Sequence, residues 1–215
     1  MNGRRDYDVM IIGGGVVGSA IARELSRYRL RTALVEKESD VAEGTSKANS
    51  GVLHAGFNVP PGSLKARFNA EGLAFFPDLA DELDVPSRRS TKLVVAKNRQ
   101  ELEVIERLLE QGRRNGTEGL SIVGRERIEK IAPGVQGEWA LYSERTGIIN
   151  PFLFTIALAE NAALNGVDVY LQTEIIAIRK LDSAGGDAVS RAGGPQHGTP
   201  FGSADGFELR TAGGE

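Results

Sequence analysis

The chain has 215 residues, a formal net charge of −3 and no cysteine. This length allows one large domain or two small ones, and the charge gives no reason to expect nucleic acid as a partner. The missing cysteines exclude disulfides and thiolate-bound metals within this chain, and two histidines are too few to predict a histidine-rich metal site. No apolar run is long enough to cross a bilayer, so we expect a cytoplasmic protein that reaches a membrane only through partners.

The first element of the chain is a β-α-β pattern with a glycine-rich turn. A short apolar run at 9–12 leads into Gly13-Gly14-Gly15-Val16-Val17-Gly18, and helix-spaced apolar residues continue to about residue 29. A second apolar run at 32–35 ends at Glu36. This order is the fingerprint of a dinucleotide-binding unit, in which the glycines and the helix N-terminus hold a pyrophosphate. Glu36 would bind ribose hydroxyls and repel the 2′-phosphate of NADP.

The middle of the chain predicts alternating helices and strands. Residues 37–62 are expected to form an ordered loop. Ser63 is expected to cap a helix that reaches Leu83 and is interrupted or kinked at Gly72 and Pro77. Asn150 would cap a helix that begins at Pro151. The other predicted helices cover 100–114 and 125–131, and the predicted strands cover 92–96, 139–142, 147–149, 167–171 and 174–181, with the second and third joined around a turn at Thr146-Gly147.

The composition changes after Asp182. Residues 183–215 are rich in glycine and predict a loop or disordered tail, with one weak strand at 206–211. Residues 6–36 and 167–181 supply only three or four strands for a parallel sheet, which is fewer than a doubly wound fold needs. We therefore expect the chain to be the N-terminal half of a longer protein, or a reading frame that ends early.

A second motif follows Glu36 along the chain. Residues 44–56 read Gly-Thr-Ser-Lys-Ala-Asn-Ser-Gly-Val-Leu-His-Ala-Gly, a run of small residues that lets the backbone lie close to a flat ligand. Together with residues 8–18, Glu36-Lys37 and the Pro61 to Ala66 stretch, this run resembles the FAD-dependent oxidoreductases of the D-amino-acid-oxidase-like superfamily. Within that superfamily, it is most similar to the glycerol-3-phosphate dehydrogenase/oxidase branch, and L-2-hydroxyglutarate dehydrogenases and oxidases share much of the pattern.

The resemblance implies an α/β fold with a Rossmann-like, glutathione-reductase-like FAD-binding domain interleaved with part of an α+β substrate domain. It implies an FAD-binding segment over 1–90, part of the substrate domain over 91–150, a return to the FAD-binding domain over 151–182, and the glycine-rich tail after it. The implied cofactor-binding residues are Gly13, Gly14, Gly15, Val16, Val17, Gly18, Glu36, Lys37, Thr45, Ser46, Asn49, Ser50, Gly51 and, through its backbone, Ile175. No metal ligand is implied.

His54 is the catalytic candidate that the resemblance singles out. A neutral imidazole can take the hydroxyl proton of an alcohol while a hydride leaves for the flavin. The alternative is a histidine that only packs beside the ring. Cations for an anionic substrate group are available at Lys65, Arg67, Arg88, Arg89 and Lys92, although solvated surface charge is the simpler interpretation of each. Tyr142 or Arg145 could face the substrate, and His197 is expected to be solvated in the tail.

The resemblance implies oxidation of a secondary alcohol by hydride transfer to FAD. Glycerol 3-phosphate is the first candidate substrate, and L-2-hydroxyglutarate, a 2-hydroxy acid, is the rival. The electrons would pass to a quinone, an acceptor protein or oxygen. Two other interpretations remain open for the isolated chain: a non-catalytic FAD-binding module and an unstable fragment. An NAD-dependent dehydrogenase fits less well, because such enzymes do not need the 44–56 loop.

Overall fold

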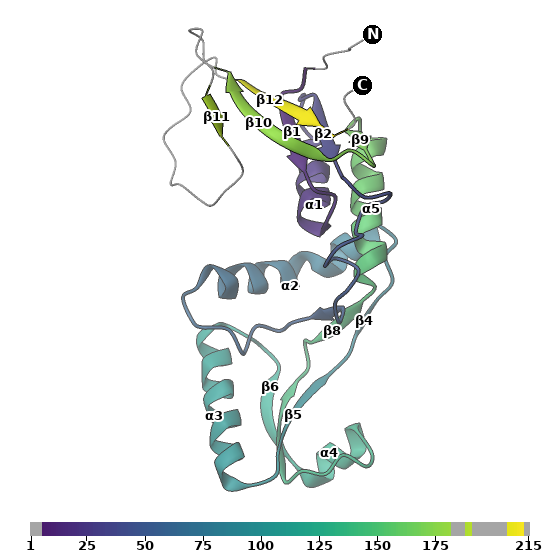
Figure 1. The fold of residues 1–215 in the computed structure, drawn as a ribbon. Helices are drawn as coiled ribbons and strands as arrows, with labels where there is room; N and C mark the ends of the chain where they lie inside the picture. The colour runs from purple at the N-terminus through teal and green to yellow at the C-terminus, as the bar shows by residue number, and fades with distance from the viewer. Residues whose placement is uncertain (1–5, 182–187, 191–205, 213–215) are drawn as a thin grey trace. The chain divides into compact units, whose positions relative to one another are not determined.

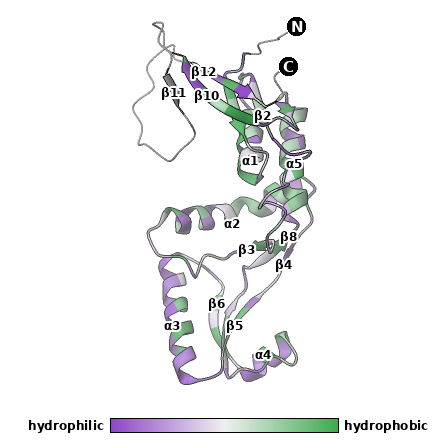
Figure 2. Cartoon of the chain, in the orientation of Figure 1, coloured by the Kyte–Doolittle hydropathy of each residue, from purple (hydrophilic) through white to green (hydrophobic). Residues whose placement is uncertain are grey.

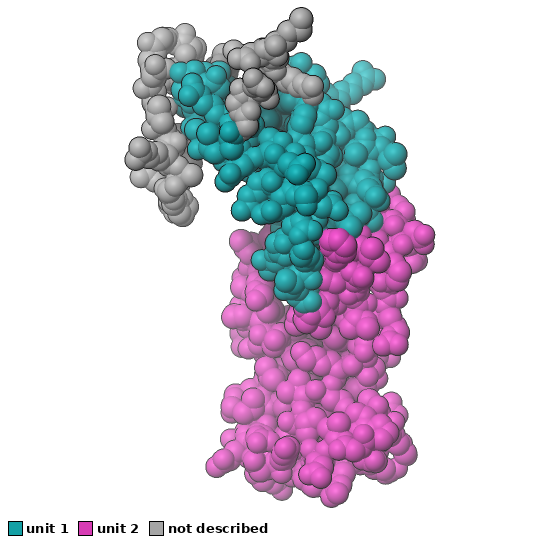
Figure 3. Space-filling model, turned by 45° about the vertical axis from the view of Figure 1, so that its right-hand side comes forward, with its two compact units in different colours: residues 1–49, 155–215 teal, residues 50–154 magenta. Residues whose placement is uncertain are grey.

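The computed structural model describes residues 6–181, 188–190 and 206–212 (Figure 1). It divides into two compact units, which are coloured separately in Figure 3. Unit 1 contains residues 1–49 and 155–215, and unit 2 contains residues 50–154. The predicted division at residue 90 is one by function, into FAD-binding and substrate segments, and it stays a prediction beside these compact units. No helix among the described residues combines the length and the apolar character that crossing a membrane requires.

Unit 1 is built on the predicted β-α-β element. Strand β1 (Val9–Ile12), helix α1 (Val16–Leu25) and strand β2 (Thr32–Val35) follow in order, and β1 and β2 pair in parallel from Val9 opposite Thr32. Strand β9 (Asp168–Tyr170) adds to the other edge of β2, also in parallel, giving the order β1-β2-β9. All four residues of β2 are buried, as expected for the central strand of a covered parallel sheet.

The core of unit 1 joins this sheet to helix α5 (Pro151–Leu164). Leu34 and Ala162 are fully buried and share one apolar cluster with Ile11, Ala22 and Val41. Figure 2 shows α5 as hydrophobic over most of its length. As predicted, Asn150 caps α5: its side-chain oxygen accepts from the N–H groups of Phe152 and Leu153, each at 3.1 Å. The first residues of α5 belong to unit 2 and the rest to unit 1.

The C-terminal strands of unit 1 decide between the three and the four parallel strands that were predicted, in favour of three among the described residues. Strand β10 (Ile175–Leu181) does not extend the parallel sheet. It pairs antiparallel with β12 (Gly206–Thr211) and with β11 (Ala188–Ser190). Its burial alternates along the strand, which is the pattern of a sheet with one solvated face. The weak strand predicted at 206–211 is present, whereas β11 lies in a stretch that was predicted to be loop. His197 lies outside the described residues.

Unit 2 contains an antiparallel sheet covered by helix α3 (Arg99–Arg114). Strand β7 (Trp139–Ser143) lies between β5 (Lys92–Ala96) and β6 (Leu120–Gly124). Leu102 and Ile105 of α3 pack on Leu141 of β7 in one buried cluster. A short helix α4 (Arg125–Ile131) follows β6. Strand β6 escaped prediction because its five residues carry only a brief apolar alternation.

A second sheet of unit 2 is formed by three very short strands. Strand β8 (Gly147–Ile149) pairs with β3 (Val52–Leu53) on one side and with β4 (Ser87–Arg89) on the other. The strands predicted at 139–142 and 147–149 are both present, but β7 and β8 belong to different sheets, so the connection at Thr146-Gly147 leads from one sheet to the other. The hydroxyls of Ser143 and Thr146 are 3.0 Å apart, which joins the two ends of the connection between the sheets.

Helix α2 (Leu64–Glu82) is not interrupted at Gly72 and Pro77, one of the two outcomes predicted there, and nothing in the helix bounds tests the other, a kink. It continues through Gly72 and Pro77 as a single helix of 19 residues. The predicted cap is present: the Ser63 hydroxyl accepts from the N–H of Ala66 at 3.1 Å. Phe76 and Phe154 meet edge to face with ring centroids 5.3 Å apart, so the second half of α2 packs on the start of α5.

Candidate functional site

The glycine-rich turn of unit 1 has the geometry that a bound pyrophosphate needs. Gly13 adopts φ +104°, a conformation that side chains disfavour, and its N–H donates to the Val35 carbonyl at 2.8 Å. A Cβ on Gly18 would collide with the Gly13 carbonyl oxygen, so only glycine lets α1 approach β1 this closely. The turn therefore brings the helix N-terminus and the end of β1 together, as the sequence predicted.

Ser46 caps the N-terminus of α1, because the N-cap residue of the helix itself cannot do so. Gly15, at the N-cap position, has no side chain to accept a hydrogen bond. Instead, the N–H of Val16 donates to the Ser46 hydroxyl oxygen at 2.9 Å, across 30 residues of sequence. A serine hydroxyl that accepts one bond still has its own proton to donate. Hydroxyl and backbone donors thus gather at the positive end of the helix, where an anion binds favourably.

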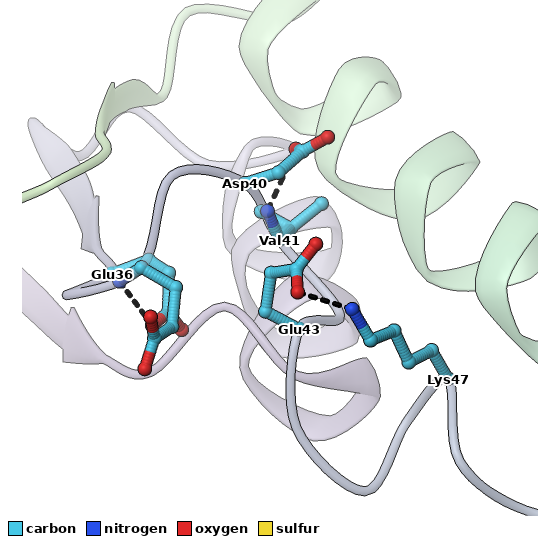
Figure 4. A network of polar contacts seen from close by, with 6 residues as sticks. Glu36, Asp40, Val41, Glu43 and Lys47 are labelled. Atoms are coloured by element: carbon cyan, nitrogen blue, oxygen red, sulfur yellow. Dashed lines mark hydrogen bonds and ion pairs between the residues drawn. The ribbon is translucent and has the colours of Figure 1, made fainter.

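Glu36 lies directly against the same turn (Figure 4). One carboxylate oxygen accepts from the Gly14 N–H at 2.6 Å, and the other accepts from the Glu38 N–H at 2.9 Å. The side chain is therefore fixed in orientation and retains lone pairs for ribose hydroxyls. Lys37 points elsewhere: it is exposed and its ammonium group lies 3.5 Å from the Glu38 carboxylate.

The segment that precedes Ile175 is attached to the Glu36 turn. The N–H of Thr173 donates to the Glu36 carbonyl and the N–H of Gln172 donates to the Glu38 carbonyl, both at 2.8 Å. Ile175 begins β10 two residues later and is paired with Thr211. The chain that leads into the predicted cofactor residue Ile175 is thus attached to the turn of Glu36, although 139 positions separate the two residues in sequence (175 − 36).

The loop from Glu43 to Asn49 is closed by its own polar side chains. The Asn49 amide donates to the carbonyls of Thr45 and Ser46, at 3.1 and 3.0 Å. Lys47 forms an ion pair with Glu43, shown in Figure 4. Asn49 thereby holds the turn that presents Ser46 to α1, while the side chain of Thr45 is exposed.

Ser50 and Gly51 begin unit 2, so the predicted cofactor residues are divided between the two units. Ser50 is exposed. Gly51 adopts φ +60°, and a Cβ there would collide with the Ile149 carbonyl oxygen. Its own carbonyl accepts from the Ile149 N–H at 2.9 Å. Gly51 is therefore required by the pairing of the backbone at the edge of β8, a reason that the sequence did not indicate.

His54 follows strand β3 and is exposed. Partial burial lowers the pKa of its imidazole below the ordinary value of 6.5, and the nearby ammonium groups of Lys92 and Lys65 lower the pKa further. The imidazole is accordingly neutral at pH 7 and able to accept a proton. Neither lysine has a carboxylate partner among the described residues, and Lys92 lies over the Phe57 ring at 5.4 Å from its centroid.

The other candidate substrate residues of unit 2 include two arginines that are already paired with carboxylates. Arg67 is paired with Glu71 at 2.9 Å, and Arg145 is paired with Glu118. Arg88 and Arg89 line a small cavity of about 90 Å³ together with Arg145. The Arg127 guanidinium lies 5.9 Å from the ring centroid of Tyr142.

Sequence reasoning missed three residues that hold the loop after His54. The side chains of Gln111, Asn115 and Thr117 donate hydrogen bonds to carbonyls of residues 55–59. Gln111 and Asn115 are four residues apart at the end of α3 and so lie on the same side of the helix, but Gln111 stands off the apolar stripe of Leu102 and Ile105, and the sequence pattern alone does not single it out.

Comparison with known proteins supports the interpretation of these features. The family model described as "FAD dependent oxidoreductase" (DAO) matches residues 8–207. The chain belongs to this DAO family. It is 47% identical over 178 residues to glycerol 3-phosphate dehydrogenase of Caloramator mitchellensis, covering 82% of this chain and 37% of that protein. It is 34% identical over 189 residues to the mitochondrial L-2-hydroxyglutarate dehydrogenase of Nematostella vectensis, covering 87% and 41%.

Solved structures of DAO-like flavoenzymes share the fold. The FAD-bound L-α-glycerophosphate oxidase of Mycoplasma pneumoniae superposes with a TM-score of 0.76 at 35% identity, covering 81% of this chain and 47% of that one. Glycine oxidase of Geobacillus kaustophilus gives a TM-score of 0.74 at 28% identity, covering 86% and 54%. The chain thus spans less than half the length of the two dehydrogenases above.

FAD, the cofactor of the DAO family, fits the residues of unit 1. The turn at Gly13 closes without a side chain, the α1 N-terminus presents donors beside Ser46, and the Glu36 carboxylate is fixed beside that turn with lone pairs left for ribose hydroxyls. Each feature matches one part of an adenine dinucleotide: the backbone approach, the pyrophosphate and the ribose.

Proposed function

We propose that this chain is the cofactor-binding and histidine-bearing part of an enzyme that oxidises glycerol 3-phosphate to dihydroxyacetone phosphate. In this proposal, unit 1 holds the dinucleotide end of FAD, and unit 2 supplies His54 and cations for the substrate. The electrons then pass to a quinone, an acceptor protein or oxygen. The similarity to glycerol 3-phosphate dehydrogenase of Caloramator mitchellensis supports this substrate over others.

The observation that carries the proposal is the electrostatic setting of His54. Its imidazole is neutral because burial and two lysines hold its pKa below 6.5. The substrate's secondary hydroxyl loses its proton to an imidazole nitrogen of His54 as the carbon–oxygen double bond forms. Bound FAD would supply the acceptor for the hydride of the same carbon. The imidazolium then returns its proton to water.

Lys65 and Lys92 give the same site a preference for anions. An ammonium group without a carboxylate partner is available to bind a phosphate, and it binds the anion more strongly where water is partly excluded. A bound phosphate dianion would also oppose the effect of the lysines and stabilise the imidazolium formed during the reaction. L-2-hydroxyglutarate is the second candidate substrate, because its carboxylates satisfy the same cations and its dehydrogenases are relatives of this chain.

The first test is a visible absorption spectrum of the purified chain reconstituted with FAD, recorded before and after anaerobic addition of each compound. Bleaching by glycerol 3-phosphate alone supports the proposed substrate, and bleaching by L-2-hydroxyglutarate alone supports the second candidate. A stable flavin spectrum that neither compound bleaches contradicts catalysis by this chain and supports the non-catalytic FAD-binding alternative.

Matched substitutions test the assigned residues. His54→Gln should slow bleaching by at least about 100-fold, the usual effect of removing a general base, while leaving FAD affinity unchanged. His197→Gln, the same replacement at the only other histidine of the sequence, is the control and should have no effect. Equal rates for H54Q and the unsubstituted chain would eliminate the catalytic role of His54.

A further inference from the structure

The segment that bears His54 belongs to no helix or strand, so its backbone lacks the regular hydrogen bonds of those elements. Residues 54–59, here named the His54 loop, begin where strand β3 ends at Leu53. His54 is exposed, whereas Ala55, Phe57 and Val59 are buried at 5%, 3% and 6% exposure. Phe57 anchors the loop in the apolar cluster of α3 and β7. The loop therefore buries backbone carbonyls that no neighbouring strand among the described residues can pair.

Three side chains from the end of α3 and from the turn after it donate hydrogen bonds to these carbonyls. Thr117 donates to the Ala55 carbonyl at 3.0 Å, and Gln111 donates to the Phe57 carbonyl at 3.1 Å. Asn115 donates to the carbonyls of both Gly56 and Val59, at 2.9 and 2.8 Å. Four of the five residues that follow His54 are thus fixed by side-chain donors.

Gly112 makes this close approach of helix and loop possible. A Cβ at this position would lie 2.8 Å from the Cβ of Phe57 and would collide with the Leu120 side chain. Because glycine has no side chain, the loop can lie directly on the last turns of α3, within hydrogen-bond distance of the residues on either side of Gly112.

We propose that Gln111, Asn115 and Thr117 are positioning residues, a clamp that holds the His54 imidazole and the Phe57–Lys92 contact in the arrangement needed for proton transfer. The proposal rests on the proposed function of His54. Pairing of β3 with β8 fixes the chain up to Leu53, and the clamp fixes it from Ala55 onward, so His54 is the one residue between two restrained segments.

Nuclear magnetic resonance of the His54 ring tests the clamp without requiring activity. The chain has two histidines, so His197→Ala leaves a single imidazole signal. In that background, Thr117→Val and Gln111→Met each remove one donor with little change of shape. We expect the imidazole pKa to rise toward 6.5 in both, because a released loop moves the partly buried ring further into water and away from Lys92 and Lys65. The clamp is refuted if chemical shift and pKa stay unchanged in both.

Two control variants separate positioning from general loss of stability. Thr117→Ser retains the hydroxyl and should restore the original titration. Gln100→Met makes the same replacement at the exposed first turn of α3, far along the helix from the loop, and should leave the titration unchanged. If these controls move the pKa as much as the clamp variants do, the effect is not specific to the clamp and the inference fails.

Flavin reduction by glycerol 3-phosphate distinguishes the clamp from the function on which it rests. T117V and Q111M should lower the maximal rate about 10- to 100-fold, because misplacement of a reacting group costs rate rather than binding. The substrate concentration for half-maximal rate should stay the same. If H54Q reduces flavin at the original rate, the proposed function fails, and the ring titration alone decides whether the clamp positions His54.

Discussion

Single hydrogen bonds connect the glycine-rich turn to residues far along the chain. The side chains of Ser46 and Glu36 accept from the N–H groups of Val16 and Gly14. The N–H of Thr173 in turn donates to the Glu36 carbonyl. The sequence predicted Glu36 and Ser46 from their place after a known pattern. It could not predict that Ser46 replaces a missing helix cap, because that role depends on how a loop of exposed residues folds back.

Removal of the Ser46 hydroxyl should weaken FAD binding. Ser46→Ala leaves the Val16 N–H without its acceptor and deletes the proposed hydroxyl donor to the pyrophosphate. Hydrogen bonds to charged groups are worth about 1.5–3 kcal/mol, so the dissociation constant should rise roughly 10- to 100-fold. Quenching of flavin fluorescence in a titration measures this change. Ser121→Ala, on an exposed position of β6, is the control. Unchanged affinity in S46A would separate Ser46 from the cofactor.

The charge of Lys92 should be visible in the titration of His54. Lys92→Met removes one of the two cations that lower the imidazole pKa, so the pKa should move upward toward 6.5. The acid limb of flavin reduction should move upward with it. Ring titration in the H197A background measures the shift, and Lys97→Met provides a matched control on an exposed position. A pKa that falls or stays constant would contradict the assigned proximity.

The sign of the linked stability follows from the same shift. Because the folded chain binds this proton less well than the unfolded chain, His54 stabilises the folded state fully above the unfolded pKa of 6.5. That contribution is lost as the pH falls from 6.5 through the lower folded pKa. Acid therefore acts against the fold at this residue.

At the scale of elements, local signals predicted most helices and the β-α-β unit. Caps at Ser63 and Asn150 and periodic apolar positions in α3 carry their information within a few residues. The choice of strand partners is not encoded within a few residues in this way. The short polar strand β4 (Ser-Arg-Arg) exists only because β8 offers it an edge, and β10 turns away from the parallel sheet because β12 pairs with it.

Two glycines in helices should respond oppositely to the same substitution. Gly112→Ala would force the new methyl group into Phe57 and Leu120, and overpacking of this kind costs about 1–3 kcal/mol. A Cβ on Gly72 of α2 would meet no other atom within 4 Å, so Gly72→Ala should gain about 0.5–1 kcal/mol of helix propensity. Urea unfolding of both variants measures the difference. A stabilised G112A would contradict the close packing of the His54 loop on α3.

At the scale of the whole molecule, two separate apolar clusters imply two cooperative units. One cluster contains Leu34 and lies in unit 1, and the other contains Leu141 and lies in unit 2. The sequence predicted a cofactor part and a substrate part, but it placed their boundary by resemblance. The contact of Gly51 with Ile149 shows why residues 50–154 pack as one compact unit, which is a division by contacts and not by function.

Core substitutions should therefore affect one unfolding transition each. Leu34→Ala and Leu141→Ala both remove a fully buried side chain, at a cost of about 2–5 kcal/mol. In calorimetry, L34A should lower only the transition that added FAD raises, and L141A should lower only the other. A single transition that both variants shift equally would mean that the two units unfold as one.

The hydrogen bond between Gly51 and Ile149 has a consequence for how such a chain can change over evolution. It joins residues near the two ends of a segment of 105 residues (50–154). In the sequence, this segment is an insertion between the two parts of unit 1. Domains with neighbouring termini tolerate exchange and insertion well. Under the proposed function, replacing this insert changes the selectivity for the alcohol, while the frame of residues 1–49 and 155–215 that is proposed to hold the dinucleotide stays as it is.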